Sequence, residues 1–532
     1  MAPPVPSRRW IFCFAMAVAI LWSLSVMADY KAEVGYAALS QELGSALPTG
    51  SGITVAQIEA KESSGFYAPS LTISQFAGDT ITIESGGTIG VSGHATSVGL
   101  NLYGSTSMTP GINTIDCFYS YDWRANSLHV SSTKEPEPQT WRVLNASFVS
   151  TSGLQAKDAD ALRRFDYTIH RDGYVAVVGT DNNPDGSVPT LMASSYNALV
   201  VGLTNGAHSH GLTSLDAPGR IKPDIVAPSS YTSFAAPIVS SAAAMLLETA
   251  DKNQALADAS HHSEVIRSLL MAGASKTDRF ADWDRTTTRP LDDVYGAGEL
   301  NIANSYNMLV AGKCPAATDK TVPTTGWDYA TGTADGNKLY FLDVPDGARA
   351  TLAASLNWDR IVTNGLTTAG QWGNPQAKVA NMDLRLFQAN GFELTDVVDQ
   401  SLSVVDNVET IYQTTLTPGR YALEVRSDMT DVPYALSWQT TTSDLILGDA
   451  NGDGAIDLLD FYALQSSFGK SGRWSDGDFN SDGRVEFDDY LILEAEYGTQ
   501  ENEFQGAAAV PEPATMTLLA AGAVLLIRRR RP

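Results

Sequence analysis

The chain has 532 residues and a formal net charge of −25 at pH 7, with 60 acidic against 35 basic side chains. A single hydrophobic core rarely grows to this length, so the sequence predicts several folded units. The acidic excess argues against nucleic-acid binding, which needs a basic surface.

The N-terminus has the layout of a secretory signal peptide. Two arginines precede an apolar run over 10–27, and Ala28 ends a small-residue cleavage site. We expect residues 1–28 to be removed during export; a retained membrane anchor is the alternative, because the run approaches spanning length. An oxidising compartment would allow Cys117 and Cys314 to pair, which the sequence leaves open.

Two apolar runs in the first half of the chain predict buried parallel strands. The first begins at residue 52 and ends in a carboxylate, Glu59. The second, over 174–179, leads into a turn that holds Asn182 and Asn183 before a proline. Both strands therefore end next to side chains that can exchange hydrogen bonds with a ligand.

The segment 222–247 predicts a strand, a turn and an alanine-rich helix. KPDIVAP at 222–228 is followed by TSFAAP at 232–237 and a run of apolar residues. We expect Pro237 in the first helical turn, where a missing N–H costs little. Ser233 then stands at a helix N-terminus, whose free N–H groups and dipole favour the negative charge that develops during acyl transfer.

The two halves of this segment resemble the serine region of the subtilisin-like serine proteases, the subtilase family. The resemblance implies the chain order acid, histidine, serine, with Ser233 as nucleophile. GHATSVG at 93–99 is similar to the family's histidine motif and implies His94 as general base. Glu59 stands where the family has Asp and would orient the imidazole, and Asn182, or Asn183 in its place, would supply the oxyanion hydrogen bond.

The resemblance implies an α/β subtilisin-like catalytic domain over 29–312, with a mostly parallel sheet, helices on both faces and the site at the carboxyl ends of the strands. It implies an exported serine endopeptidase that cleaves peptide or protein substrates through an acyl-enzyme. The Glu59 substitution also supports an inactive surface protein that binds peptides without cleaving them. The remaining histidines in polar stretches are expected at the surface: His208, His210, His261 and His262.

Residues 313–327 are rich in Pro, Thr and Gly and are expected to form a linker. Short alternating runs with Gly and Pro turns follow and predict a β-sandwich over 328–443. The layout resembles the prepeptidase C-terminal domains of secreted bacterial proteases, most clearly in TPGRYALEV at 417–425. The predicted strands cover 339–344, 350–356, 383–387, 413–416, 421–425 and 434–438.

Residues 445–500 contain two twelve-residue segments with the spacing of a calcium-binding loop. Side-chain oxygens stand at positions 1, 3, 5, 9 and 12, a glycine allows the sharp turn at position 6, and position 7 offers its backbone carbonyl. Ca²⁺ is therefore the expected metal. The ligands of the first loop are Asp449, Asn451, Asp453, Ala455, Asp457 and Asp460, and those of the second are Asp478, Asn480, Asp482, Arg484, Glu486 and Asp489.

The pairing of two such loops, each followed by a helix and each with Asp at position 12, resembles the dockerin module. The resemblance implies a cohesin-like partner, and a calcium-dependent scaffold component is a further alternative for the whole chain. Many dockerins carry Ser-Thr at loop positions 10 and 11, where this chain has Leu458-Leu459 and Phe487-Asp488. Calcium-stabilised spacing of the protease from the cell surface is therefore at least as well supported as cohesin binding.

The C-terminus has three parts after a linker over 501–510. Pro-Glu-Pro at 511–513 precedes an apolar run and then four arginines at 528–531. Residues 511–532 resemble the PEP-CTERM sorting signal of Gram-negative bacteria, which implies a sorting enzyme and a cell-surface location. A plain basic tail anchor is the alternative.

Overall fold

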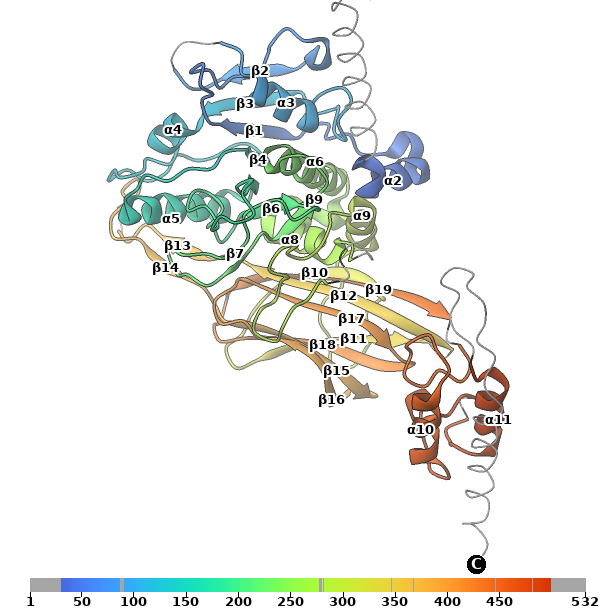
Figure 1. The fold of residues 1–532 in the computed structure, drawn as a ribbon. Coiled ribbons are helices and arrows are strands. Elements are labelled where there is room, and N and C mark those ends of the chain that lie inside the picture. The colour runs from blue at the N-terminus through green and yellow to red at the C-terminus, as the bar shows by residue number, and fades with distance from the viewer. Residues whose placement is uncertain are drawn as a thin grey trace, which may run out of the picture.

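The computed structural model describes residues 30–498, apart from 87–89, 277–279, 281, 346, 367, 445 and 481. The expected signal peptide, the linker at 501–510 and the sorting signal lie outside the described residues. Figure 1 shows three folded parts in chain order: an α/β part, an antiparallel β part and a small helical part.

Seven parallel strands form the central sheet of the α/β part, in the order β2-β3-β1-β4-β5-β6-β9 (Figure 1). The expected mostly parallel sheet is thereby confirmed. The strands are β1 (Thr54–Glu59), β2 (Thr80–Ile83), β3 (Thr114–Tyr119), β4 (Val143–Ala146), β5 (Val175–Gly179), β6 (Leu199–Leu203) and β9 (Ile225–Ala227), and a separate hairpin is formed by β7 (Gly211–Leu212) and β8 (Ile221–Lys222).

Helices cover both faces of this sheet. Along β5, Val175 and Val177 join the hydrophobic core that contains α6, whereas Ala176 and Val178 join the core that contains α5. This alternation is the period of two that a strand imposes on its side chains. The helices are α2 (Tyr36–Leu43), α3 (Gly93–Leu102), α4 (Ser120–Asp122), α5 (Gln155–Asp172), α6 (Thr232–Asp251), α7 (Ala257–His261), α8 (Ser263–Gly273) and α9 (Ile302–Ala311).

Helix α6 is the central helix of the α/β part. Among the described residues it is the one helix long and apolar enough to cross a membrane by length and composition, yet 83% of that stretch is buried inside the protein. Its run of small side chains lets it pack closely on the sheet, as the burial of Ala242, Ala243 and Ala244 shows.

Two four-stranded antiparallel sheets form the second part, with orders β10-β19-β12-β17 and β11-β18-β15-β16. A shared core that includes Leu356, Leu384 and Leu436 joins the two sheets face to face. The strands are β10 (Thr325–Thr331), β11 (Asn337–Val344), β12 (Ala348–Trp358), β15 (Met382–Asn390), β16 (Glu393–Ser401), β17 (Val408–Leu416), β18 (Gly419–Ser427) and β19 (Pro433–Asp444), with a hairpin of β13 (Ile361–Thr363) and β14 (Gln376–Lys378).

The segment expected to be a linker, 313–327, is a fixed part of the structure. It ends inside β10, where Trp327 is fully buried and belongs to the core of the α/β part. The Trp327 indole N–H donates to the Leu309 carbonyl over 3.0 Å. The C-terminal end of the segment is therefore held in place by this buried tryptophan.

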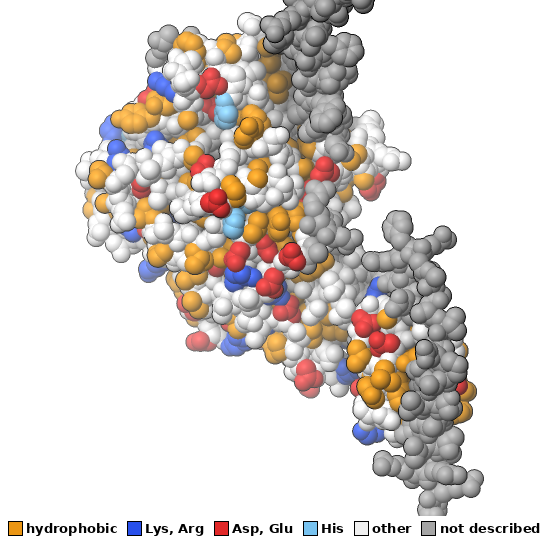
Figure 2. All heavy atoms as spheres, in the orientation of Figure 1, with side chains coloured by type: hydrophobic (Ala, Val, Ile, Leu, Met, Phe, Trp, Pro, Cys, Tyr) orange, Lys and Arg blue, Asp and Glu red, His pale blue; other side chains and the backbone are white. Residues whose placement is uncertain are grey.

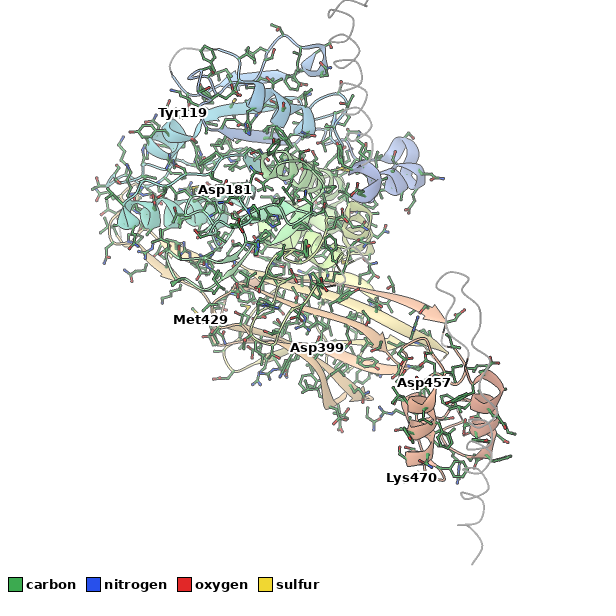
Figure 3. All side chains as sticks on the ribbon, viewed as in Figure 1. Tyr119, Asp181, Asp399, Met429, Asp457 and Lys470 are labelled. Carbon is green, nitrogen blue, oxygen red and sulfur yellow. The ribbon has the colours of Figure 1, made fainter. Side chains whose placement is uncertain are left out.

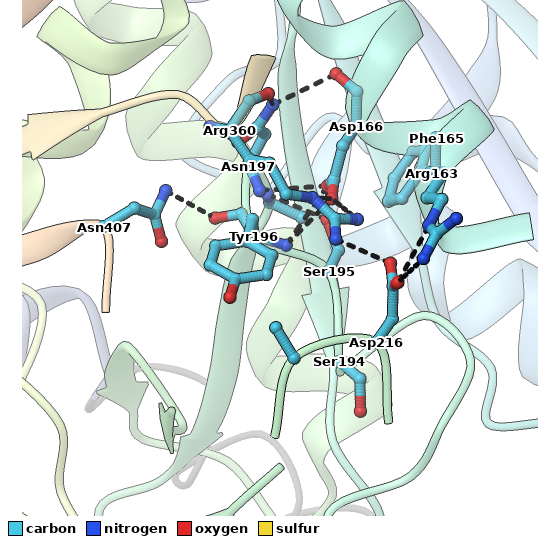
Figure 4. A network of polar contacts seen from close by, with 12 residues as sticks. Arg163, Phe165, Asp166, Ser194, Ser195, Tyr196, Asn197, Asp216, Arg360 and Asn407 are labelled. Carbon is cyan, nitrogen blue, oxygen red and sulfur yellow. Dashed lines mark hydrogen bonds and ion pairs between the residues drawn. The ribbon is translucent and has the colours of Figure 1, made fainter. Parts of the chain in front are cut away.

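Buried polar contacts also fasten the two parts together (Figure 4). Arg360, in the connection between β12 and β13, forms ion pairs with Asp166 of α5 and with Asp216. Its backbone N–H donates to the Asn197 side-chain oxygen over 2.8 Å. Asn407 donates to the Tyr196 carbonyl over 3.0 Å. Ion pairs and hydrogen bonds therefore join the β-sandwich directly to the α/β part.

The helical part contains α10 (Leu458–Ser467) and α11 (Phe487–Glu496), each directly after one of the predicted loops. Its core includes Ile456, Leu464, Val485 and Leu493. Figure 2 shows hydrophobic side chains gathered on the visible face of this part. Its exposed large hydrophobic residues are Leu447, Leu458, Leu459, Tyr462, Phe487 and Leu491.

His208, expected at the surface, is fully buried. Its Nδ1 accepts from the Leu203 N–H over 3.0 Å, and its Nε2 lies 2.9 Å from the Val294 carbonyl, which can only accept. The ring is therefore a neutral tautomer with both nitrogens bonded, and burial lowers its pKa to about 4. Cys117 is buried, Cys314 is half-buried, and both are free thiols.

Candidate active site

Glu59 and His94 meet at the carboxyl end of the central sheet. Glu59 is the last residue of β1 and is fully buried, and His94 lies in the first turn of α3, which Ser92 caps. The distance from His94 Nδ1 to Glu59 Oε2 is 2.9 Å. This hydrogen bond raises the pKa of His94 above its usual 6.5 against the opposing effect of burial. Burial raises the pKa of Glu59, and the hydrogen bond from His94 counteracts it.

Ser233 is the second residue of α6, as the sequence predicts for a nucleophile at a helix N-terminus. Pro237 lies inside the helix and not in its first turn, which corrects the expectation from sequence. Because Pro237 has no N–H, it leaves the carbonyl four residues earlier, that of Ser233, without its helical donor. The Ser147 hydroxyl donates to that carbonyl over 2.9 Å and ties the start of α6 to the end of β4.

The serine and histidine elements pack side by side. The ring of Phe234, next to Ser233, lies 5.6 Å from the His94 ring between centroids. Among the described residues, no hydrogen bond links the Ser233 hydroxyl to His94. Such contacts are often long before substrate binds and shorten in the substrate complex. Figure 3 marks this edge of the sheet with Tyr119, which ends β3, and Asp181, which follows β5.

Asn182 is joined to the serine helix, whereas Asn183 is not. The Thr232 N–H donates to Asn182 Oδ1 over 2.8 Å, and this bond orients the amide next to Ser233. Asn183 Oδ1 instead accepts from Asp185 within its own turn, over 3.3 Å. Of the two asparagines that the sequence leaves open, Asn182 is therefore the one placed beside the serine.

Residues 77–298 match the family model of the subtilase family, Peptidase S8, and residues 509–531 match the PEP-CTERM protein-sorting motif. The chain carries a serine-protease domain. No curated protein matches the chain. His94, Asn182 and Ser233 lie within the matched residues of the protease, and Glu59 precedes them.

Solved structures similar to the protease cover about half of it at low identity. The prenylagaramide maturation protease PagA is 18% identical, covers 48% of this chain and 93% of its own, and gives a TM-score of 0.34. A mutant of the PatA protease domain is 17% identical, with coverages of 50% and 97% and a TM-score of 0.35. The PatG macrocyclase in complex with peptide is 15% identical, with coverages of 50% and 98% and a TM-score of 0.33.

Three polar side chains that sequence reasoning missed surround the Glu59–His94 pair. Gln57 donates to Glu59 Oε1 over 2.8 Å, and Tyr103 donates to Gln57 over 2.6 Å. Glu62 accepts from the His94 backbone N–H over 2.7 Å. One signal was available: a glutamine inside a buried apolar strand, two residues before the carboxylate, needs polar partners.

A cavity of about 330 Å³ opens beside the segment that continues β4. In this segment the Ser147 N–H donates to the Ile58 carbonyl and the Ser150 N–H to the Leu191 carbonyl. Thr151 and Ser152 then line the cavity together with the N-terminal part of α5. The segment thus connects the residue that contacts Ser233 with the wall of the cavity.

The two predicted calcium loops have matching hydrogen-bond patterns. In the first, Asp449 accepts from the N–H groups of Gly452 and Gly454, and Asp460 accepts from those of Ala450 and Asp457. In the second loop Asp478 and Asp489 take the same roles. Across the described residues, no group of three or more His, Cys, Asp or Glu side chains is gathered so that it could hold a metal ion. The loop carboxylates are engaged by backbone N–H groups.

Proposed function

We propose that the protease is an exported endopeptidase that acts through Glu59, His94 and Ser233. The observation that carries the proposal is the 2.9 Å contact between Glu59 and the Nδ1 of His94, at the sheet edge where α6 presents Ser233. The buried carboxylate accepts a hydrogen bond from the Nδ1–H group of His94, which leaves the Nε2 lone pair free to accept a proton.

In the proposed reaction His94 takes the Ser233 hydroxyl proton as the oxygen attacks the scissile carbonyl. The imidazolium that forms is stabilised by Glu59 and then protonates the leaving amine. Water, activated by His94, hydrolyses the acyl-enzyme and restores Ser233. A substrate strand lying beside 147–150 would run toward Thr151 and Ser152, which line the cavity.

Fluorophosphonate labelling of the full chain tests the proposal, since the reagent reacts with an activated serine. We expect labelling of the wild type and none of Ser233→Ala. Ser147→Ala serves as a matched control, because its hydroxyl contacts the Ser233 carbonyl and not the nucleophile. An unlabelled wild type whose Glu59→Asp variant is labelled would instead support the inactive peptide-binding alternative.

We expect Asn182→Ala to lower kcat by about a hundredfold or more, the size known for oxyanion donors in subtilases. The Asn182 amide is held beside Ser233 by the Thr232 N–H, so its Nδ2 can donate to the tetrahedral oxygen. Steady-state hydrolysis of a peptide substrate measures the loss. Asn183→Ala, which removes the neighbouring amide, is expected to leave kcat within a few-fold of wild type, and an equal loss there would reject the assignment.

We further propose that the paired-loop module binds Ca²⁺ and spaces the protease from the cell surface to which the C-terminal motif directs it. The support is the repeated placement of oxygen-bearing side chains around two matching turns. The exposed Leu458 and Leu459 offer an apolar contact to a cohesin-like partner as the second candidate role.

Adding Ca²⁺ to the full chain is expected to stabilise the module by about 2.7 kcal/mol for each occupied loop at a hundredfold excess over Kd. Calorimetry with Ca²⁺ and with chelator measures the shift. Asp460→Ala and Asp489→Ala together should abolish it, whereas Asp488→Ala, an acidic neighbour that is not a predicted ligand, should preserve it. A transition that ignores Ca²⁺ in the wild type would refute calcium binding.

A further inference from the structure

A chain of buried hydrogen bonds leads from the Glu59 carboxylate into the protein. Gln57 precedes Glu59 by two residues on β1, so both side chains leave the strand on the same face. Both are fully buried, and Tyr103 at the end of α3 is 1% exposed. Every polar group in this region therefore needs a partner within the protein.

The orientation of the Gln57 amide follows from its partners. Its Nε2 lies 2.8 Å from the Ala95 carbonyl, which can only accept, so this end carries the N–H groups. The second N–H then faces Glu59 Oε1 over 2.8 Å. Gln57 Oε1 must accept, and the Tyr103 hydroxyl donates to it over 2.6 Å.

Both Glu59 oxygens are thus fixed: Oε2 faces His94 and Oε1 faces Gln57. A glutamate has one more rotatable bond than an aspartate, so its carboxylate has more orientations to lose. The hydrogen bond from Gln57 also favours the charged carboxylate and so counteracts burial, which raises the Glu59 pKa.

Helix α3 supplies both ends of this arrangement. It begins next to His94 and is capped at its C-terminus by Tyr103, whose hydroxyl donates to Gln57 of β1. Gly99 makes the space: a Cβ at this residue would lie 2.4 Å from the Tyr103 hydroxyl oxygen. The Tyr103 ring also packs on Phe76, with centroids 4.8 Å apart, which fixes its position.

We infer that Gln57 and Tyr103 are positioning residues that hold the longer Glu59 carboxylate in the orientation His94 requires. The inference rests on the proposed function of Glu59 and deepens it. Tyr103 touches neither His94 nor Ser233 through any contact that the described residues record, so it acts through Gln57 and Glu59.

The test is Tyr103→Phe in the full chain, which removes the donor but keeps the ring. We expect kcat/KM to fall about tenfold through kcat with KM unchanged, the effect of one lost hydrogen bond in a buried network. Tyr67→Phe is the matched control, because it removes another buried hydroxyl, which donates to the Ser85 carbonyl over 2.6 Å. Equal losses in both variants would overturn the inference.

A double-mutant comparison separates positioning from general destabilisation. In a Glu59→Gln background, Tyr103→Phe should cause no further loss, because the group it positions is already gone. A full tenfold loss in that background would contradict the inference.

NMR titration of His94 provides a readout that does not require activity. The carboxylates that face His94 are Glu59, on its ring, and Glu62, on its backbone N–H. Tyr103→Phe should lower the pKa of His94 toward 6.5, since the carboxylate that stabilises the imidazolium is held less well. An unchanged His94 pKa would overturn the inference. A wild-type protein that fluorophosphonate does not label would reject only the proposed catalysis.

Discussion

Replacing Glu59 by glutamine is expected to lower kcat/KM by about four orders of magnitude while the fold is kept. Glutamine has the shape of glutamate, but it can present an N–H at the position where the carboxylate accepts a hydrogen bond from His94 Nδ1. The imidazole would then carry its proton on Nε2, the atom that must accept from Ser233. Steady-state hydrolysis of a peptide substrate measures the loss, and thermal unfolding shows whether the fold persists.

Glu62→Gln is the control for this variant. It keeps an oxygen that can accept from the His94 backbone N–H, so kcat/KM should change by less than about tenfold. A comparable loss in both variants would mean that acidic charge near His94 matters and that the specific hydrogen bond to Glu59 does not.

The same hydrogen bond sets the pH dependence. Because Glu59 raises the pKa of His94, the neutral base forms only above the usual 6.5, and the acid limb of kcat/KM should lie there. In Glu59→Gln this limb should move to lower pH. The raised folded-state pKa also means that the pair stabilises the fold below pH 6.5, and that this stabilisation is lost as pH rises through the folded-state pKa of His94.

The parts of the site that the sequence could predict are those that sit in local patterns. Ser233 follows a strand and opens an alanine-rich helix, and Glu59 ends an apolar run, so each is marked by its neighbours. Parallel strands bring their carboxyl ends to one edge, which predicts that such residues meet. The choice of Asn182 over Asn183 required the Thr232 contact, which links residues 50 apart in the chain.

What the sequence could not predict depends on contacts between distant residues. The Tyr103 hydroxyl meets Gln57 across 46 residues, and no periodicity marks either of them as partners. His208 stands in a polar stretch but is buried because a backbone N–H and a carbonyl satisfy its ring. Strand β16 was missed because only its last residue, Ser401, is buried, so it lacks the apolar alternation that marks half-buried strands.

Helix α5 connects the β-sandwich with the cavity beside the segment that continues β4. Its N-terminal residues Lys157 and Asp158 line the cavity, and Asp166 and His170, further along it, contact the sandwich. His170 lies 3.0 Å from Asp359, next to Arg360. The sandwich therefore supports the helix that forms one wall of the cavity, and loosening it should reduce the order of that wall.

Arg360→Met is expected to destabilise the protease by about 3–5 kcal/mol, the cost of leaving a buried carboxylate without its partner. Asp166 is fully buried and accepts from Arg360 Nε over 2.9 Å. Burial alone would raise the pKa of Asp216, yet the guanidinium groups of Arg360 and Arg163 hold it below its ordinary value. Methionine fills similar volume without the charge, so Asp166 loses its counter-ion, whereas Asp216 keeps its ion pair with Arg163. Urea unfolding of the full chain measures the change.

Arg420→Met is the matched control, because this arginine pairs with Asp343 at the surface of the same sandwich. Exposed ion pairs contribute at most about 1 kcal/mol, so little change is expected. If Arg360→Met cost no more than Arg420→Met, the buried network would not hold the two parts together. If Arg360→Met instead gave the β-sandwich a separate transition at lower urea, the buried network would be what makes the two parts unfold together. Loss of peptide hydrolysis in that first transition would show that the α/β part depends on the sandwich.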